Sequence, residues 1–188
     1  MKVFAAVSVP LLLSHAALAQ HQFFAVDPSA SEVRMTLHTN HDIVNGTFHV
    51  QSGSIDFDPG AQKIRGIVVI AAGTGKTGND SRDKKMNKDV LKVDQFSTVT
   101  FAPKTFTGTL TSKGDSTIQV SGVFTLLGAQ HDVTIPMEVH LDASKGTASA
   151  EFTVPYVRWG LKNPGFLMWK ADNDVAIHLV LNGQVSNE

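Results

Sequence analysis

The chain contains no cysteine, one tyrosine and no strong excess of charge of either sign. Its 188 residues include 16 lysines and arginines against 17 aspartates and glutamates, which gives a formal net charge of −1. The lack of cysteine excludes disulfide bonds, thiolate metal sites and a cysteine nucleophile. Near-neutral charge without a basic patch argues against a nucleic acid as partner. After the N-terminal region, no apolar run is long enough for a membrane-spanning helix.

The common catalytic motifs are also missing. The sequence has neither a Gly-x-Ser-x-Gly elbow nor a His-Glu-x-x-His helix. His131 and Asp132 are neighbours in a predicted strand and point to opposite faces, so they do not form a proton relay. A triad assembled from distant segments leaves no trace in a single sequence. We therefore expect a protein that is not an enzyme.

The N-terminal stretch "MKVFAAVSVPLLLSHAALAQ" is typical of a secretory signal peptide. A basic residue precedes a short apolar run, and Ala17-Leu18-Ala19 offers a small-x-small cleavage site. We expect residues 1–19 to be removed near Ala19-Gln20, leaving a single domain over 20–188. Export without cysteine indicates a periplasmic or secreted bacterial protein whose core needs no disulfides.

The stretch "IVVIAAGTGKTGNDSRD" resembles a phosphate-binding loop at first sight. A P-loop requires a glycine five positions before its Gly-Lys-Thr, and that position, counted from Gly75, is Ile70. The following residues indicate a turn, whereas a P-loop leads into a buried helix. The glycines are therefore predicted to form a bend between a strand and a short charged helix running from Asp83 to about Val93.

Alternating apolar residues predict strands along most of the remaining chain. "HDVTIPMEVHL" and "VAIHLVLNG" each place every second residue on an apolar face, and Pro136 on the polar side of the first indicates a sheet edge or a bulge. In "TFHVQSGSIDF" the apolar set changes parity at Ser52-Gly53, as a β-bulge would produce. Eight or nine short strands with one helix predict an antiparallel barrel or sandwich. Such a barrel is either filled by side chains or hollow enough for one ligand, and the pattern alone leaves both open.

Four segments together resemble the YceI-like family of exported lipid- or polyisoprenoid-binding domains. These are "HDIVNGTFHVQSGSIDFDP", "SRDKKMNKDVLKVDQFSTVTFAP", "VSGVFTLLGAQHDVTIPMEV" and "FTVPYVRWGLKNP". Leu127 departs from the family, in which many members carry a histidine there, and Lys76-Thr77 is an insertion. The resemblance implies an all-β, antiparallel, eight-stranded lipocalin-like barrel. It also implies a carrier that holds a polyisoprenoid, isoprenoid quinone or fatty amide in an apolar tunnel, without a cofactor.

Apolar residues on the inner faces of the predicted strands are the candidates for lining this tunnel. They are Met35, Leu37, Phe48, Phe57, Phe101, Phe124, Leu126, Phe152 and Val154. In the Gly- and Pro-rich segment "YVRWGLKNPGFLMWK", residues Trp159, Phe166 and Trp169 form either an apolar flap over the tunnel or a loop that closes the barrel end.

Polar candidates are few. Arg82 either contacts an anionic head group of the ligand or pairs with an aspartate to hold the helix. His38, His41 and His49, with Asp42, form the one local histidine cluster, although the two strand histidines lie on polar faces; no metal site is predicted. The alternatives to a lipid carrier are a packed barrel with an interaction or stress role, and a histidine-based metal-binding protein. The sequence leaves open which lipid is bound and whether the barrel forms a homodimer.

Overall fold

The computed structural model describes residues 21–165 and 168–187. The predicted signal peptide over residues 1–19 lies outside this part of the chain, as does Phe166. Within the described residues, no helix has the length and apolar character needed to cross a membrane.

Long antiparallel strands account for most of the described chain, as the alternating pattern predicts. They are β1 (Gln22–Val26), β2 (Glu32–His38), β3 (Ile43–Asp58), β4 (Lys63–Lys76), β5 (Thr98–Gly108), β6 (Gly114–Leu126), β7 (Ala129–Asp142), β8 (Lys145–Val154) and β9 (Val175–Asn187). The helix α1 (Asp80–Lys85) and a π-helical turn, η1 (Met86–Val90), follow β4.

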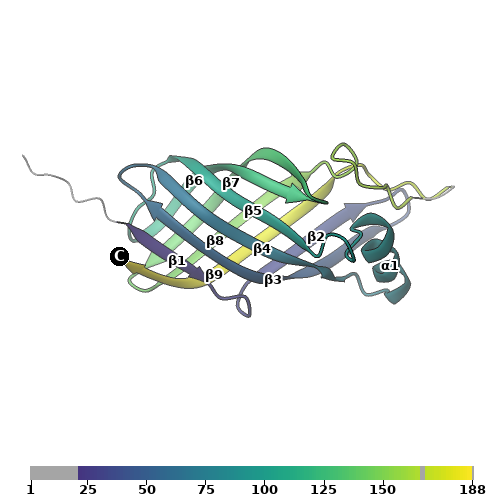
Figure 1. Cartoon of the computed structure of the whole chain (residues 1–188), viewed down its shortest axis with the longest axis horizontal. Helices are drawn as coiled ribbons and strands as arrows, with labels where there is room; N and C mark the ends of the chain where they lie inside the picture. The colour runs from purple at the N-terminus through teal and green to yellow at the C-terminus, as the bar shows by residue number, and fades with distance from the viewer. Residues whose placement is uncertain (1–20, 166–167, 188) are drawn as a thin grey trace, which may run out of the picture.

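The sheet closes into a barrel with eight strand positions. Strands β2 to β9 pair in the order β3-β2-β9-β8-β7-β6-β5-β4, and pairing between β3 and β4 completes the circle. The short β1 also pairs with both β3 and β9, so β1 and β2 occupy successive parts of one position. Figure 1 shows α1 at one end of the barrel and the C-terminus at the other; we call these the helix end and the terminal end. The eight-stranded antiparallel barrel is confirmed.

Bulges curve the long strands around the barrel. The register between β3 and β4 shifts between Val50 and Ser52, which confirms the predicted parity change and places it beside Ser52. A further shift lies between Thr47 and His49, and β5 has one between Pro103 and Thr105. Because each shift moves the inward-facing set by one residue, apolar parity cannot be followed through a whole strand.

The helix begins earlier than the sequence predicts. Asn79 caps it, since its side-chain oxygen accepts a hydrogen bond from the Arg82 backbone N–H at 3.0 Å. The α-helix ends at Lys85 and gives way to η1, so the predicted span from Asp83 to Val93 is wrong at both ends. The cause of the error is that apolar spacing marks the packed residues but not the capping residue.

Gly75 explains the glycine-rich bend before the helix. A Cβ at this position would lie 2.4 Å from Cε of Met86 and 2.7 Å from the ring of Phe48. The backbone of β4 therefore approaches these side chains closely at the helix end, which favours glycine because any Cβ would make them shift. The glycine-rich bend thus allows Met86, which follows the helix, to pack against the barrel at Gly75.

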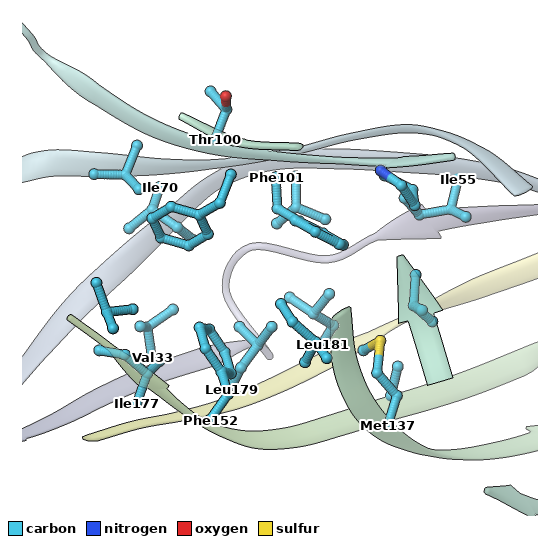
Figure 2. Close-up of a pocket in the computed structure, with 18 of the residues that line it drawn as sticks. Val33, Ile55, Ile70, Thr100, Phe101, Met137, Phe152, Ile177, Leu179 and Leu181 are labelled. Atoms are coloured by element: carbon cyan, nitrogen blue, oxygen red, sulfur yellow. The ribbon is translucent and has the colours of Figure 1, made fainter. Parts of the chain in front are cut away.

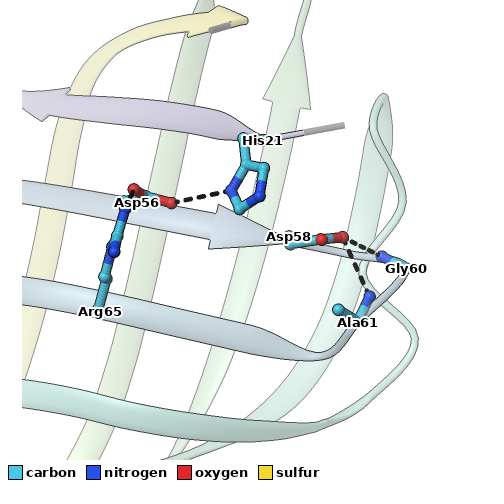
Figure 3. Close-up of polar contacts among 6 residues, drawn as sticks. All are labelled: His21, Asp56, Asp58, Gly60, Ala61 and Arg65. Atoms are coloured by element: carbon cyan, nitrogen blue, oxygen red, sulfur yellow. Dashed lines mark hydrogen bonds and ion pairs between the residues drawn. The ribbon is translucent and has the colours of Figure 1, made fainter. Parts of the chain in front are cut away.

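Two aspartates of β3 organise the terminal end, as Figure 3 shows. Asp58 is buried and accepts backbone hydrogen bonds from Gly60 at 2.9 Å and Ala61 at 3.0 Å, which closes the β3–β4 turn. Asp56 accepts from Arg65 of β4 and also contacts His21 before β1. The Arg65 hydrogen bond holds the pKa of Asp56 below its ordinary value. These contacts fix β1, β3 and β4 side by side.

Strands β7 and β8 pair along only part of their length. Their register runs from Glu138↔Ser149 to Asp142↔Lys145, at the terminal end. Toward the helix end, Gln130–Met137 of β7 pair with β6 alone and Ala150–Val154 of β8 pair with β9 alone among the described residues. We call this unpaired stretch the β7–β8 seam. Pro136 lies in it without a bulge, so the predicted sheet edge is confirmed at this position.

Candidate functional site

An elongated cavity occupies the interior of the barrel. Its volume is about 220 Å³, and within the described part of the chain no charged side chain lines it. Lining residues come from both ends, with Phe24 and Leu141 near the terminal end and Val154 and Val175 near the helix end. An apolar cavity of about 150 Å³ accommodates benzene, so this interior has room for part of a hydrocarbon chain.

Regular alternation along the strands builds the apolar wall. On β9, for example, every second residue from Val175 to Leu181 faces inward. Figure 2 shows Ile70 and Phe101 on one wall and Phe152, Leu179 and Leu181 on the other, with their side chains directed into the space between. Several of these inner residues are only partly buried although they lie inside the barrel, because the space beside them is unfilled. The interior is therefore hollow over much of its length.

Most of the residues predicted to line the tunnel border this cavity. They are Phe48, Phe57, Phe101, Phe124, Leu126, Phe152 and Val154. Met35 and Leu37 do not border it, although they share the inward parity of Val33 and Met35 lies directly opposite the cavity-lining Ile177 of β9. For these two, strand parity identified the inward face but not which inward residues border the cavity. Whether any of these residues touches a ligand stays a prediction.

The two described tryptophans of the predicted flap lie outside the cavity wall. Trp169 is 58 % exposed and packs against His41, with the two ring centroids 4.7 Å apart. Trp159 packs at the edge of the apolar cluster formed by Leu126, Val154 and their neighbours. Figure 1 places the β8–β9 loop that carries both residues at the helix end. This position fits both readings of the segment, a closing loop and a flap.

Arg82 holds the bend at the helix and is not part of the cavity wall. Its Nε donates to the Thr77 hydroxyl and its Nη2 to the Thr77 carbonyl, each at 2.8 Å. The buried Asp83 accepts from the Thr77 backbone N–H at 2.9 Å and lies 3.7 Å from Nζ of Lys76. The Thr77 hydrogen bonds hold the pKa of Asp83 below its ordinary value. Contact between Arg82 and a ligand head group stays a prediction without support from the cavity's geometry.

The histidine cluster does not converge. Across residues 21–165 and 168–187, no group of three histidine, cysteine or acidic side chains is placed to hold a metal ion. His41 is occupied by its contact with Trp169. The arrangement therefore offers no argument for the metal-binding alternative.

Sequence reasoning missed a larger part of the wall than it found. The additional lining residues include Phe24, Ile55, Val120, Met137, Leu179 and Leu181. For Met137, Leu179 and Leu181 the signal was present, because each belongs to an alternating apolar run. Ile55 follows the β3 bulge, where the parity of the strand changes. Phe24 lies in the five-residue β1, which is too short for alternation to be read.

A row of aromatic side chains leads from the cavity to the β7–β8 seam. Phe152 and Phe124 line the cavity with ring centroids 6.3 Å apart, and Phe124 lies 5.5 Å from Trp159. Trp159 in turn stacks on His131 of β7, at a centroid distance of 4.1 Å and an interplanar angle of 5°. The turn after β8 brings Trp159 there, since its backbone N–H donates to the Pro155 carbonyl at 3.1 Å. The stacked rings of Trp159 and His131 therefore lie at the β7–β8 seam.

Tyr156 ties the same turn to the barrel. Its hydroxyl donates to the Asp172 carbonyl at 2.6 Å, and burial, followed by the charges of Asp172 and Asp174, raises its pKa to about 12. In the unfolded chain the phenol ionises near pH 10, so the contribution of Tyr156 to stability is complete below pH 10 and is lost as the pH rises toward 12.

We expect this shift to be visible directly, because Tyr156 is the only tyrosine in the sequence. Titration of tyrosinate absorbance in the folded protein should show a midpoint close to pH 12. The Tyr156→Phe variant should show no tyrosinate signal and no corresponding loss of stability above pH 10. A midpoint at the ordinary value of about 10 in the folded protein would contradict the buried hydroxyl.

Comparison with known proteins gives one family and several structures of the same fold. The family model for the YceI-like domain matches residues 24–182. No protein of curated function matches the chain.

The similar solved structures share little sequence with this chain. BcnA of Burkholderia cenocepacia has 18 % identity and a TM-score of 0.68, over 86 % of this chain and 99 % of BcnA. A polyisoprenoid-binding domain from Saccharophagus degradans has 15 % identity and a TM-score of 0.65, over 87 % and 98 %. The YceI protein of Campylobacter jejuni has 21 % identity and a TM-score of 0.54, over 77 % and 85 %. At these identities the likeness shows the fold.

Proposed function

Because the chain belongs to the family of YceI-like domains, we propose that it is an exported, non-enzymatic carrier of a long-chain amphiphile. The ligand class is a polyisoprenoid, an isoprenoid quinone or a fatty amide, held along the barrel axis. The observation that carries this proposal is the cavity of about 220 Å³ with its apolar wall. The structural similarity to a polyisoprenoid-binding domain of Saccharophagus degradans supports the same ligand class.

Burial of hydrocarbon supplies enough free energy for such a role. At about 0.8 kcal/mol per buried CH₂, ten enclosed carbons contribute on the order of 8 kcal/mol before the cost of ordering the chain. That magnitude corresponds to affinities around the micromolar range. A long chain also suits a cavity whose lining residues come from both ends of the barrel.

Native mass spectrometry of protein purified from its own organism tests the proposal. We expect an added mass of several hundred daltons that organic extraction removes and that fragments as a long-chain amphiphile. The protein mass itself should lack residues 1–19, which tests the proposed export. Ligand-free protein that also fails to bind prenyl alcohols and fatty amides in vitro would favour the packed barrel with an interaction role.

A further inference from the structure

His131 carries a buried polar atom that the barrel leaves without a partner. Its Nε2 is enclosed yet makes no hydrogen bond within the described residues. Burying an imidazole nitrogen unpaired is unfavourable, because its hydrogen bonds to water are lost and not replaced. The ring itself is well held, since it stacks on Trp159.

The position of His131 connects this atom to the cavity. His131 pairs directly with Phe124 across β6 and β7, so their side chains lie on the same face of the sheet. Phe124 lines the cavity, and therefore His131 lies on the inner face beside this part of the cavity wall. The unpaired β7–β8 seam runs beside it, and Trp159 is the side chain that covers the imidazole there.

We propose that the β7–β8 seam is the head-group site of the carrier, in which the ligand's polar head hydrogen-bonds to Nε2 of His131. This inference rests on the proposed function, because it requires the ligand's hydrocarbon chain to lie in the cavity. Trp159 moves aside as the head enters, and the hydrogen bond to the ligand satisfies the atom that is unpaired in the closed barrel. The hydrocarbon then extends past Phe124 and Phe152 into the cavity.

The chemistry of the site selects a neutral head that carries a hydroxyl group. A hydroxyl both donates and accepts, so it matches Nε2 in either tautomer of a neutral imidazole. A phosphate needs cationic partners, and the cavity wall has no charged side chain in the described chain. Arg82, the cation first considered for a head group, donates to Thr77.

A pair of ligands and a pair of variants test this assignment. The ligands are a tetraprenyl alcohol and the tetraprenyl hydrocarbon of the same length, measured by displacement of a fluorescent apolar dye. His131→Phe keeps a flat ring against Trp159 but removes the nitrogen. We expect this variant to bind the alcohol about tenfold more weakly than the parent and the hydrocarbon about equally well. His140→Phe is the matched control: His140 lies on the outer face of β7, bonded to Asp115 at 2.6 Å, and its replacement should change neither affinity.

The outcomes separate this inference from the proposed function. If the parent binds neither ligand, the carrier function itself fails. If the parent and His131→Phe bind the alcohol equally well, the carrier stands and the head-group site is wrong. A measurement on the parent protein alone guards against misfolding of the variant: the ¹⁵N resonance of His131 Nε2 should shift with the alcohol and not with the hydrocarbon. An unchanged resonance with bound alcohol also overturns the assignment.

Discussion

Replacement of Ala148 by phenylalanine is expected to lower the affinity for long-chain ligands about 100-fold. Ala148 lines the cavity between Val139 of β7 and Leu181 of β9, which line it as well. A phenyl ring occupies much of a 220 Å³ space, since about 150 Å³ accommodates benzene. Excluding about four carbons of the ligand at 0.8 kcal/mol each removes about 3 kcal/mol, which corresponds to about two orders of magnitude in Kd.

The same substitution should leave the fold intact, which separates a blocked cavity from a damaged barrel. Filling apolar space commonly raises stability, so the midpoint of thermal unfolding is expected to stay constant or rise. Ala176→Phe is the control, because Ala176 lies exposed on β9 and faces away from the interior. Dye displacement should show parental affinity for this control. Unchanged affinity in Ala148→Phe would mean that the ligand binds elsewhere.

The fold was predictable from the sequence because each long strand exposes one face and encloses the other. Runs such as β7 and β9 carry that alternation over many residues, and a whole barrel follows from repeating it. The helix boundaries were not predictable at the same level, because they depend on Asn79, a capping residue outside the apolar pattern. Residues on the inner face were therefore identified more reliably than the ends of elements.

The polar part of the candidate site was missed for a different reason. In the sequence, His131 drew attention only as a neighbour of Asp132. Because the two side chains point to opposite faces of the strand, a proton relay between them was excluded. Its relation to Trp159 depends on a turn after β8 and on the incomplete pairing of β7 with β8. Both are long-range features without a local sequence signal, although Pro136 did indicate an interruption of the sheet at this position.

Replacement of Gly66 by alanine is expected to destabilise the barrel by about 2–5 kcal/mol, from backbone strain and overpacking together. Gly66 has a φ of +137°, and a Cβ there would lie 2.1 Å from the Ser54 carbonyl oxygen of β3. The obstacle to this Cβ is backbone, which cannot rotate away, and Gly66 lies within the stretch from Lys63 to Val68 where the register with β5 shifts. In a domain of this size, the midpoint of thermal unfolding should fall by about 10 °C.

Gly73→Ala, in the same strand, isolates the cause of this effect. A Cβ at Gly73 would meet only Cβ of Val93, at 3.9 Å, so its stability should lie within about 0.5 kcal/mol of the parent's. A Gly66→Ala protein as stable as Gly73→Ala would show that β4 shifts freely against β3. Such freedom would also weaken the argument for the cavity, because Ile55, Ile64 and Val68 line it on both sides of this crossing. A rigid β3–β4 register is thus what keeps this part of the wall in place and the interior open.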